Sequence, residues 1–182
     1  MNYSPENIIE FWYSGRVAKQ WFNSTPELDN EIRLNYELTW ERASQGDLDL
    51  WGESANGSLA LVIILDQFPL NMYRGLARSF KTEQKAVNIA LHALDNDFHR
   101  QLKKDKLVFL YMPLMHSEEL AMQELSVKLF REANAAENLR FAEHHRDIIR
   151  RFGRFPHRNA ILGRDSTVAE LDYLASKNAF RG

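Results

Sequence analysis

Apolar residues recur along this chain at the three- and four-residue spacing of α-helices, and no segment alternates convincingly with the two-residue period of a β-strand. Behind Thr25-Pro26 they stand four residues apart, at Leu28, Ile32, Tyr36 and Trp40. A hydroxyl residue before proline is typical of a helix start, because the hydroxyl caps free N–H groups and proline lacks one. Ser4-Pro5 repeats this signal, and Gly46-Asp47 is expected to end the second helix.

Further segments carry other helix signals. Every residue from Leu59 to Leu65 is apolar, which indicates a helix buried on most sides, and Pro69 is expected to end or kink it. Thr82 is expected to cap a helix that runs to about Asp97. Pro113 is expected to stop the short apolar segment that begins at Leu107.

The remaining third of the chain continues the pattern. Ser117 is expected to cap a helix with Glu118 in its first turn, and a further helix is predicted from about Ala136 to Phe152. Thr167 to Glu170 has the spacing of a capping box. The pattern therefore predicts an all-α protein, a compact stack of seven to nine helices with short connections.

The composition favours a single domain, residues 1–182, with ample apolar material for a core. The chain has no cysteine, so disulfides, thiolate metal sites and cysteine nucleophiles are excluded. The first residues lack the pattern of a signal peptide, and the longest apolar run, residues 59–65, is far shorter than the ~20 residues of a membrane helix. We therefore expect a cytoplasmic protein without a membrane partner.

Charge is distributed unevenly along the chain. The formal net charge of −2 argues against nucleic acid as a partner. Residues 139–164 nevertheless contain seven arginines against only Glu143 and Asp147, which leaves the rest of the chain at −7. Guanidinium groups suit bidentate binding of carboxylates or phosphates, and they also suit buried ion pairs.

Three polar segments interrupt the apolar pattern. In the first, Asp66 follows a buried helix and is expected either to form an ion pair, with Arg74 as the nearest candidate, or to bind a ligand. In the second, His116 and Glu118 flank a predicted helix start. Either Ser117 simply caps that helix, or His116 is an acid–base group that Glu118 orients.

The third segment, residues 144–159, is the richest in arginine and histidine. His145 shares a helix face with apolar residues, so it is either a satisfied core histidine or a functional group. His157, Arg158 and Asn159 follow Pro156 and are expected on a loop, where functional groups concentrate. The clustered arginines require nearby anions, which are either internal acids or an external ligand.

Several common motifs are absent. The chain has no glycine-rich phosphate loop, no dinucleotide fingerprint, no His-Glu-x-x-His pair and no Gly-x-Ser-x-Gly elbow. The spacing of His116, Glu118, His145 and His157 is unspecific for a metal. We therefore predict neither a metal site nor a cofactor.

The three polar segments resemble the bacterial family called domain of unknown function 924. The resemblance rests on residues 66–75, on Tyr111 to Glu118 and on residues 145–159, and it extends over nearly the whole chain. One position departs from the family pattern, because Leu70 stands where arginine is usual. The resemblance implies an all-helical fold similar to tetratricopeptide-like arrays of helical hairpins, and it implies no activity.

We expect the three segments to meet in a cleft that binds a small anion, such as a phosphate ester, nucleotide or carboxylate, with acid–base or hydrolytic chemistry if it is an enzyme. The candidate catalytic residues are His116, Glu118, His145 and His157. The candidate ligand-binding residues are Asp66, Arg74, Arg146, Arg151, Arg154, Arg158 and Asn159. The alternatives are a module that grips an acidic peptide and a purely structural polar network. The oligomeric state cannot be predicted from these patterns.

Overall fold

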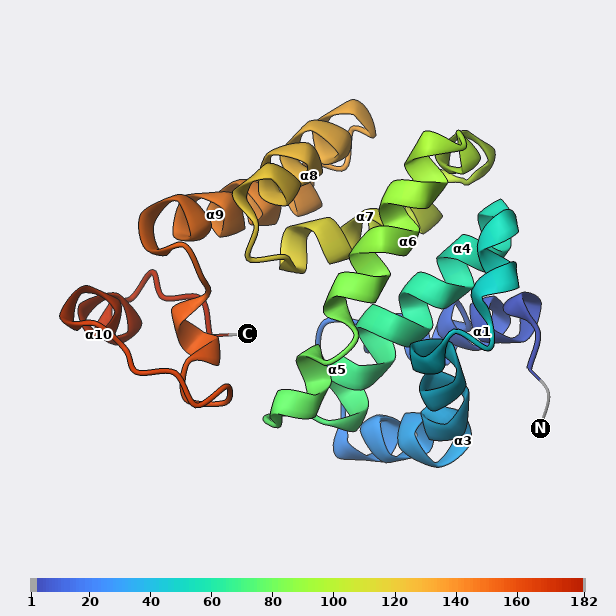
Figure 1. Cartoon of the computed structure of the whole chain (residues 1–182), viewed down its shortest axis with the longest axis horizontal. Coiled ribbons are helices and arrows are strands. Elements are labelled where there is room, and N and C mark those ends of the chain that lie inside the picture. Colours follow the sequence, from blue (N-terminus) through green and yellow to red (C-terminus); the bar gives the residue numbers. More distant parts are fainter. Residues whose placement is uncertain (1–2, 182) are drawn as a thin grey trace.

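A computed structural model describes residues 3–181, and all of its regular elements are helical (Figure 1). The first half contains α1 (Pro5–Trp12), α2 (Gly15–Ala18), α3 (Pro26–Gln45), α4 (Ala55–Val62), α5 (Phe68–Met72) and α6 (Glu83–Asp95). The second half contains α7 (Lys104–His116), α8 (Leu120–Glu132), α9 (Ala136–Phe152) and α10 (Val168–Ala175). Eight of these helices have eight residues or more, which confirms the predicted all-α class.

Shorter helical turns connect these helices. The 3₁₀ turns are η1 (Asp49–Glu53), η3 (Ala77–Phe80), η4 (Phe98–Gln101) and η5 (Pro156–Arg158), and η2 (Ile63–Gln67) is a π-helical turn. No helix within residues 3–181 combines the length and apolar character needed to span a membrane. The tetratricopeptide-like hairpin arrangement and the single-domain organisation stay predictions.

Local signals set most helix ends. Ser4 and Thr25 accept hydrogen bonds from first-turn N–H groups, Gly46 ends α3 in the left-handed conformation, and Thr167 and Glu170 form the predicted capping box. Gly153 ends α9 in the same left-handed way, with φ of 69°. Glycine adopts this conformation without the steric penalty that a side chain brings, so it stops a helix cleanly.

Pro69 does not end its helix, which was one of the two outcomes predicted for it. The chain remains helical from α4 through η2 into α5, and Pro69 lies near the start of α5. Because proline has no N–H, the Leu65 carbonyl one turn earlier lacks its usual donor. The Thr82 hydroxyl donates to that carbonyl at 2.6 Å and accepts from the Trp40 indole at 3.0 Å. The Thr82 hydroxyl therefore replaces the donor that Pro69 lacks, and its side chain does not cap α6 as predicted.

The prediction that Pro113 stops its helix is wrong. Pro113 lies inside α7, which continues to His116. Ser117 does not cap α8 either, because that helix begins only at Leu120, and the Ser117 hydroxyl instead accepts from the Glu119 N–H at 3.1 Å. Glu118 therefore lies in the short α7–α8 connection and is free to point across to another element.

Two apolar clusters hold the helices together. The main cluster draws on α1 to α9 and contains large buried rings such as Trp12, Trp40 and Phe68. The smaller cluster joins the end of α9 to the C-terminal segment through Ile148, Phe155 and Tyr173. The polar residues described next lie where this C-terminal segment meets the main body.

Candidate functional site

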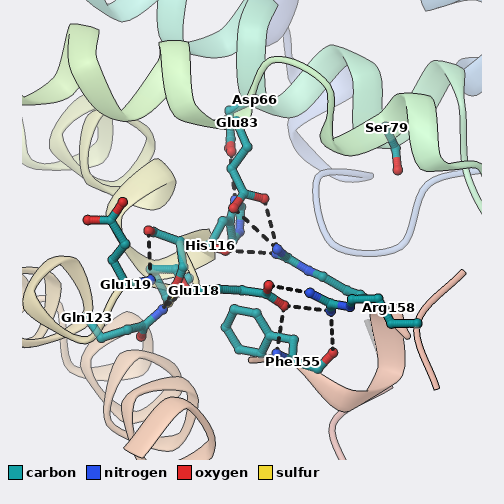
Figure 2. A network of polar contacts seen from close by, with 12 residues as sticks. Asp66, Ser79, Glu83, His116, Glu118, Glu119, Gln123, Phe155 and Arg158 are labelled. Atoms are coloured by element: carbon teal, nitrogen blue, oxygen red, sulfur yellow. Dashed lines mark hydrogen bonds and ion pairs between the residues drawn. The ribbon is translucent and has the colours of Figure 1, made fainter. Parts of the chain in front are cut away.

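The three polar segments do meet, although Asp66 and His116 are 50 residues apart along the chain and His116 and Arg158 are 42 apart. Figure 2 shows Asp66, His116 and Arg158 around one point, with Glu83 beside them. Asp66 comes from η2, His116 is the last residue of α7, and Arg158 is the last residue of η5. The predicted contact between the three segments is therefore present in the structure, whereas the cleft and its anionic ligand stay predictions.

The centre of the network is a contact between an acid and an imidazole. The His116 Nδ1–H donates to Asp66, with Nδ1 2.8 Å from Oδ1 and 3.1 Å from Oδ2. Asp66 is buried and also accepts from the Gln67 amide, so its oxygens face donors only. Such charge-assisted hydrogen bonds are stronger than those between neutral groups. This arrangement fixes the imidazole with Nδ1 inward.

The second ring nitrogen of His116 points elsewhere. The side chain is 18% exposed, and Nε2 has no hydrogen-bond partner among residues 3–181, yet it is not sealed from solvent. Burial by itself lowers the pKa of His116, but attraction and hydrogen bonding from Asp66 raise it overall, with a further contribution from Glu83. The imidazole is thus held toward its charged form, with one N–H reachable from outside.

Arg158 ties the C-terminal segment to this centre. Its guanidinium donates to Glu83 at 3.0 Å and to the main-chain carbonyl of His116 at 2.9 Å. The rings of Phe80 and Phe155 each lie 4.5 Å from the guanidinium carbon, and the side chain is only 7% exposed. Burial raises the pKa of Glu83, although the Arg158 charge opposes this shift. Arg158 therefore forms a nearly buried ion pair between two flanking aromatic rings.

Glu118 belongs to a second ion pair, not to His116 as we predicted. It accepts two hydrogen bonds from Arg164, at 2.6 and 2.9 Å, and one from the Phe155 N–H at 2.8 Å. Burial opposes ionisation of Glu118, but these donors lower its pKa overall. Asn159 supports the pair by accepting from Arg164 at 3.1 Å. This second pair is a brace between the α7–α8 connection and the C-terminal segment.

His145 and His157 lie in a different environment from His116. His145 is 4% exposed, and neither of its ring nitrogens has a hydrogen-bond partner among the described residues. Burial lowers the pKa of His145 to about 3 and that of His157 to about 4, and the His116 charge adds to both shifts, while the Met115 carbonyl opposes the first. Both imidazoles are neutral at neutral pH and pack against aromatic rings.

Four predicted ligand-binding arginines lie outside the central network. Arg74 pairs with Asp29 at 2.9 Å and not with Asp66, and its side chain is 60% exposed. Arg154 pairs with the buried Glu170 at 2.7 Å. Arg146 contacts its neighbour Asp147, and Arg151 lies over the rings of Phe152 and Tyr173. Each of these arginines pairs with an acid or packs on an aromatic ring away from the centre. They therefore do not meet there with Arg158, although they are close to it in the sequence or were predicted to share its site.

Two open grooves are also separate from the network. One, of about 390 Å³, is bordered by Asp29 and Arg74, and the other, of about 360 Å³, by Arg151, Arg154 and Glu170. Within residues 3–181 no three His, Asp or Glu side chains are arranged to hold a metal ion.

Sequence reasoning missed three residues of the network. Glu83 had no visible signal, since an acid in a first helical turn is usually explained by the helix dipole. Arg164 was counted within the arginine-rich segment but was not assigned a partner. Gln67, next to Asp66, appeared only as part of the motif. Partners such as these are set by tertiary contacts between distant segments, which the spacing of residues in the sequence does not encode.

Fold and network together define an all-helical protein in which an acid–imidazole pair and two arginine–carboxylate pairs join three distant segments. The chain belongs to the family described as bacterial protein of unknown function (DUF924), whose family model matches residues 8–178. It is similar to the solved structure of the protein of unknown function ATU0120 from Agrobacterium tumefaciens, with 37% identity and a TM-score of 0.89. That match covers 94% of this chain and 96% of the other. No curated protein matches the chain.

Proposed function

We propose that this protein binds a small anionic ligand, such as a phosphate ester or carboxylate, at His116, and that His116 transfers a proton to it. The observation that carries the proposal is the Asp66–His116 contact at 2.8 Å, which leaves Nε2 reachable from solvent. An oriented imidazole with a carboxylate on its far nitrogen is a common arrangement for acid–base catalysis. The raised pKa of His116 makes it a proton donor near neutral pH.

The adjacent Arg158–Glu83 pair supports an anionic ligand. Both terminal nitrogens of Arg158 are occupied, so an incoming anion at this point competes with Glu83 for the guanidinium. Burial raises the pKa of Glu83, which makes this carboxyl easier to neutralise or displace than an exposed glutamate. Bidentate guanidinium binding suits phosphate and carboxylate equally well.

The class of reaction that fits these groups is proton transfer or hydrolysis. In hydrolysis, a water molecule would attack the phosphorus or ester carbon and the bond to the leaving oxygen would break, while His116 donates its Nε2 proton to that oxygen. The proton of the attacking water would then pass to Nε2, and Asp66 would hold Nδ1 throughout and stabilise the charged imidazole. Asp66 is buried and accepts only from the protein, so its role is to position His116 and not to contact the ligand.

A purely structural network is the alternative that has specific support. Arg154 donates to Glu170 and the Asp165 carbonyl, and Arg164 donates to Glu118 and the Phe155 carbonyl, as expected of internal braces. The experiment must therefore separate ligand binding from stability.

We expect inorganic phosphate to shift the histidine NMR resonance of His116 at neutral pH, with smaller effects on exposed histidines. The substitution His116→Gln should weaken phosphate binding at least tenfold, because it removes the positive charge while keeping a polar side chain. His92→Gln is the matched control, since His92 is exposed on α6. A saturable phosphate affinity that is equal in wild type and His116→Gln, or no phosphate binding at all, contradicts the proposal.

A further inference from the structure

The C-terminal tail turns back onto the protein after α10. Figure 1 shows the C-terminal end beside η5, and the Phe180 N–H donates to the Tyr173 hydroxyl at 2.9 Å. The Phe180 side chain is partly buried against the smaller apolar cluster. A terminal segment anchored by so few contacts is the part of a domain that leaves most easily.

The Phe180 ring occupies a place formed mainly by two histidines. Its centroid lies 4.3 Å from the ring of His145 and 5.0 Å from that of His157, both in edge-to-face orientation. His144 and Phe155 complete the surroundings at 6.4 and 6.5 Å. These distances are those of direct aromatic packing, so this place has the size and shape of one planar ring.

Phe180 fits this place in shape but not in polarity. Neither ring nitrogen of the buried His145 has a hydrogen-bond partner of good geometry among residues 3–181, although the Met115 main chain lies near enough to oppose the fall in its pKa, and His157 beside it is half-buried. Buried donors and acceptors are normally satisfied, and a phenyl ring offers them nothing. A planar ring that carries nitrogen or oxygen atoms could pack in the same way and also bond to both imidazoles.

We infer that His145, Phe155 and His157 form a site for a heteroaromatic ring such as a nucleobase, and that Phe180 is its internal occupant until a ligand displaces it. The inference rests on the proposed function for the identity of the whole ligand. Arg158 contacts both sites, because it donates to the His116 carbonyl at 2.9 Å and lies 4.5 Å from the centre of the Phe155 ring, so the two sites are neighbours. A phosphate ester with a nucleobase would place its phosphate at His116 and its ring at the position of Phe180.

The test compares the full-length wild type with Phe180→Ala, which removes the occupant without disturbing a helix. Adenosine is the probe for the ring site alone, inorganic phosphate is the probe for His116 alone, and adenosine 5′-monophosphate tests both. We expect Phe180→Ala to bind adenosine and adenosine 5′-monophosphate at least tenfold more tightly than wild type does, with phosphate affinity unchanged. The adenine ring should also shift the NMR resonances of His145 and His157.

Phe22→Ala is the control, because Phe22 is a largely exposed phenylalanine and its loss should change no affinity. If adenosine moves neither His145 nor His157 in Phe180→Ala, the ring site is refuted, whatever phosphate does. If adenosine binds there but phosphate fails to reach His116, the ring site stands and the proposed function fails. If phosphate binds at His116 but adenosine does not bind at the ring site, the proposed function stands and the ring site is refuted.

Discussion

His116 and His145 belong to neighbouring regions of the molecule, yet their surroundings shift their pKa values in opposite directions. His116 meets the buried carboxylate of Asp66, which outweighs the effect of burial and raises its pKa. His145 meets aromatic rings and no carboxylate, so burial lowers its pKa to about 3. The comparison shows that one partner residue decides whether a buried imidazole is a charged proton donor or a neutral packing surface.

The largest expected effect comes from Arg158, which joins the two regions. Arg158→Met keeps an apolar stem between Phe80 and Phe155 but leaves Glu83 without its cation. Breaking a buried pair from one side costs about 3–5 kcal/mol of stability. Denaturant unfolding at pH 7 measures the loss, and the double variant with Glu83→Gln should recover part of it. A change below about 1 kcal/mol in the single variant would mean that this pair braces nothing.

The next effect concerns the His116 region alone. Asp66→Asn removes the charge but keeps the shape, so burial and the Arg158 charge should outweigh the remaining attraction of Glu83, and the pKa of His116 should fall below 6.5. Losing this charged hydrogen bond should destabilise the protein by about 1.5–3 kcal/mol at neutral pH. Histidine NMR titration and unfolding measure both quantities. An unchanged His116 midpoint in Asp66→Asn would show that another group holds its charge.

A pH-dependent effect concerns the His145 region. Because the pKa of His145 is about 3 when folded and 6.5 when unfolded, its contribution is complete above pH 6.5 and is lost as pH falls toward 3. At pH 5 the loss is about 2 kcal/mol, from roughly 1.5 pH units at 1.36 kcal/mol each. His145→Phe should remove this loss. His116 has the opposite sign, since its raised pKa makes its contribution complete below 6.5 and lost at higher pH. Equal acid sensitivity in wild type and His145→Phe would contradict the assignment.

The smallest effect is expected far from both histidines. Asp29→Asn breaks the pair with Arg74, whose side chain is mostly exposed and well solvated. Such surface pairs contribute about 1 kcal/mol or less. Unfolding at pH 7 should therefore show little change, and raising the salt concentration should remove it. A loss as large as that of Arg158→Met would show that the first polar segment has a structural role we have not assigned.

The helical class and most helix ends could be predicted because their causes are local. A capping hydroxyl before proline and a glycine at the C-cap act within one helical turn, as at Ser4, Thr25 and Gly153. Pro69 and Pro113 misled the prediction because packing keeps both helices continuous through proline. Pro69 cannot donate to the Leu65 carbonyl, and the hydroxyl of Thr82, 17 residues after Leu65, donates to it instead.

The site was predicted in outline but not in its pairings. Because clustered arginines require acids, the three segments were predicted to meet, and they do. The predicted partners were Arg74 for Asp66 and His116 for Glu118, whereas the structure pairs Asp66 with His116 and Glu118 with Arg164. Ion pairing is not specific to residue type, so which acid meets which base is decided by the geometry of the packed helices.

The most direct test of the central claim is a pH titration of the individual histidines by NMR in the wild-type protein. We predict a midpoint above 6.5 for His116, with His145 and His157 staying neutral down to about pH 5. A His116 midpoint below 6.5 would contradict it, because the imidazole would then be uncharged at neutral pH and unable to donate a proton to an anion.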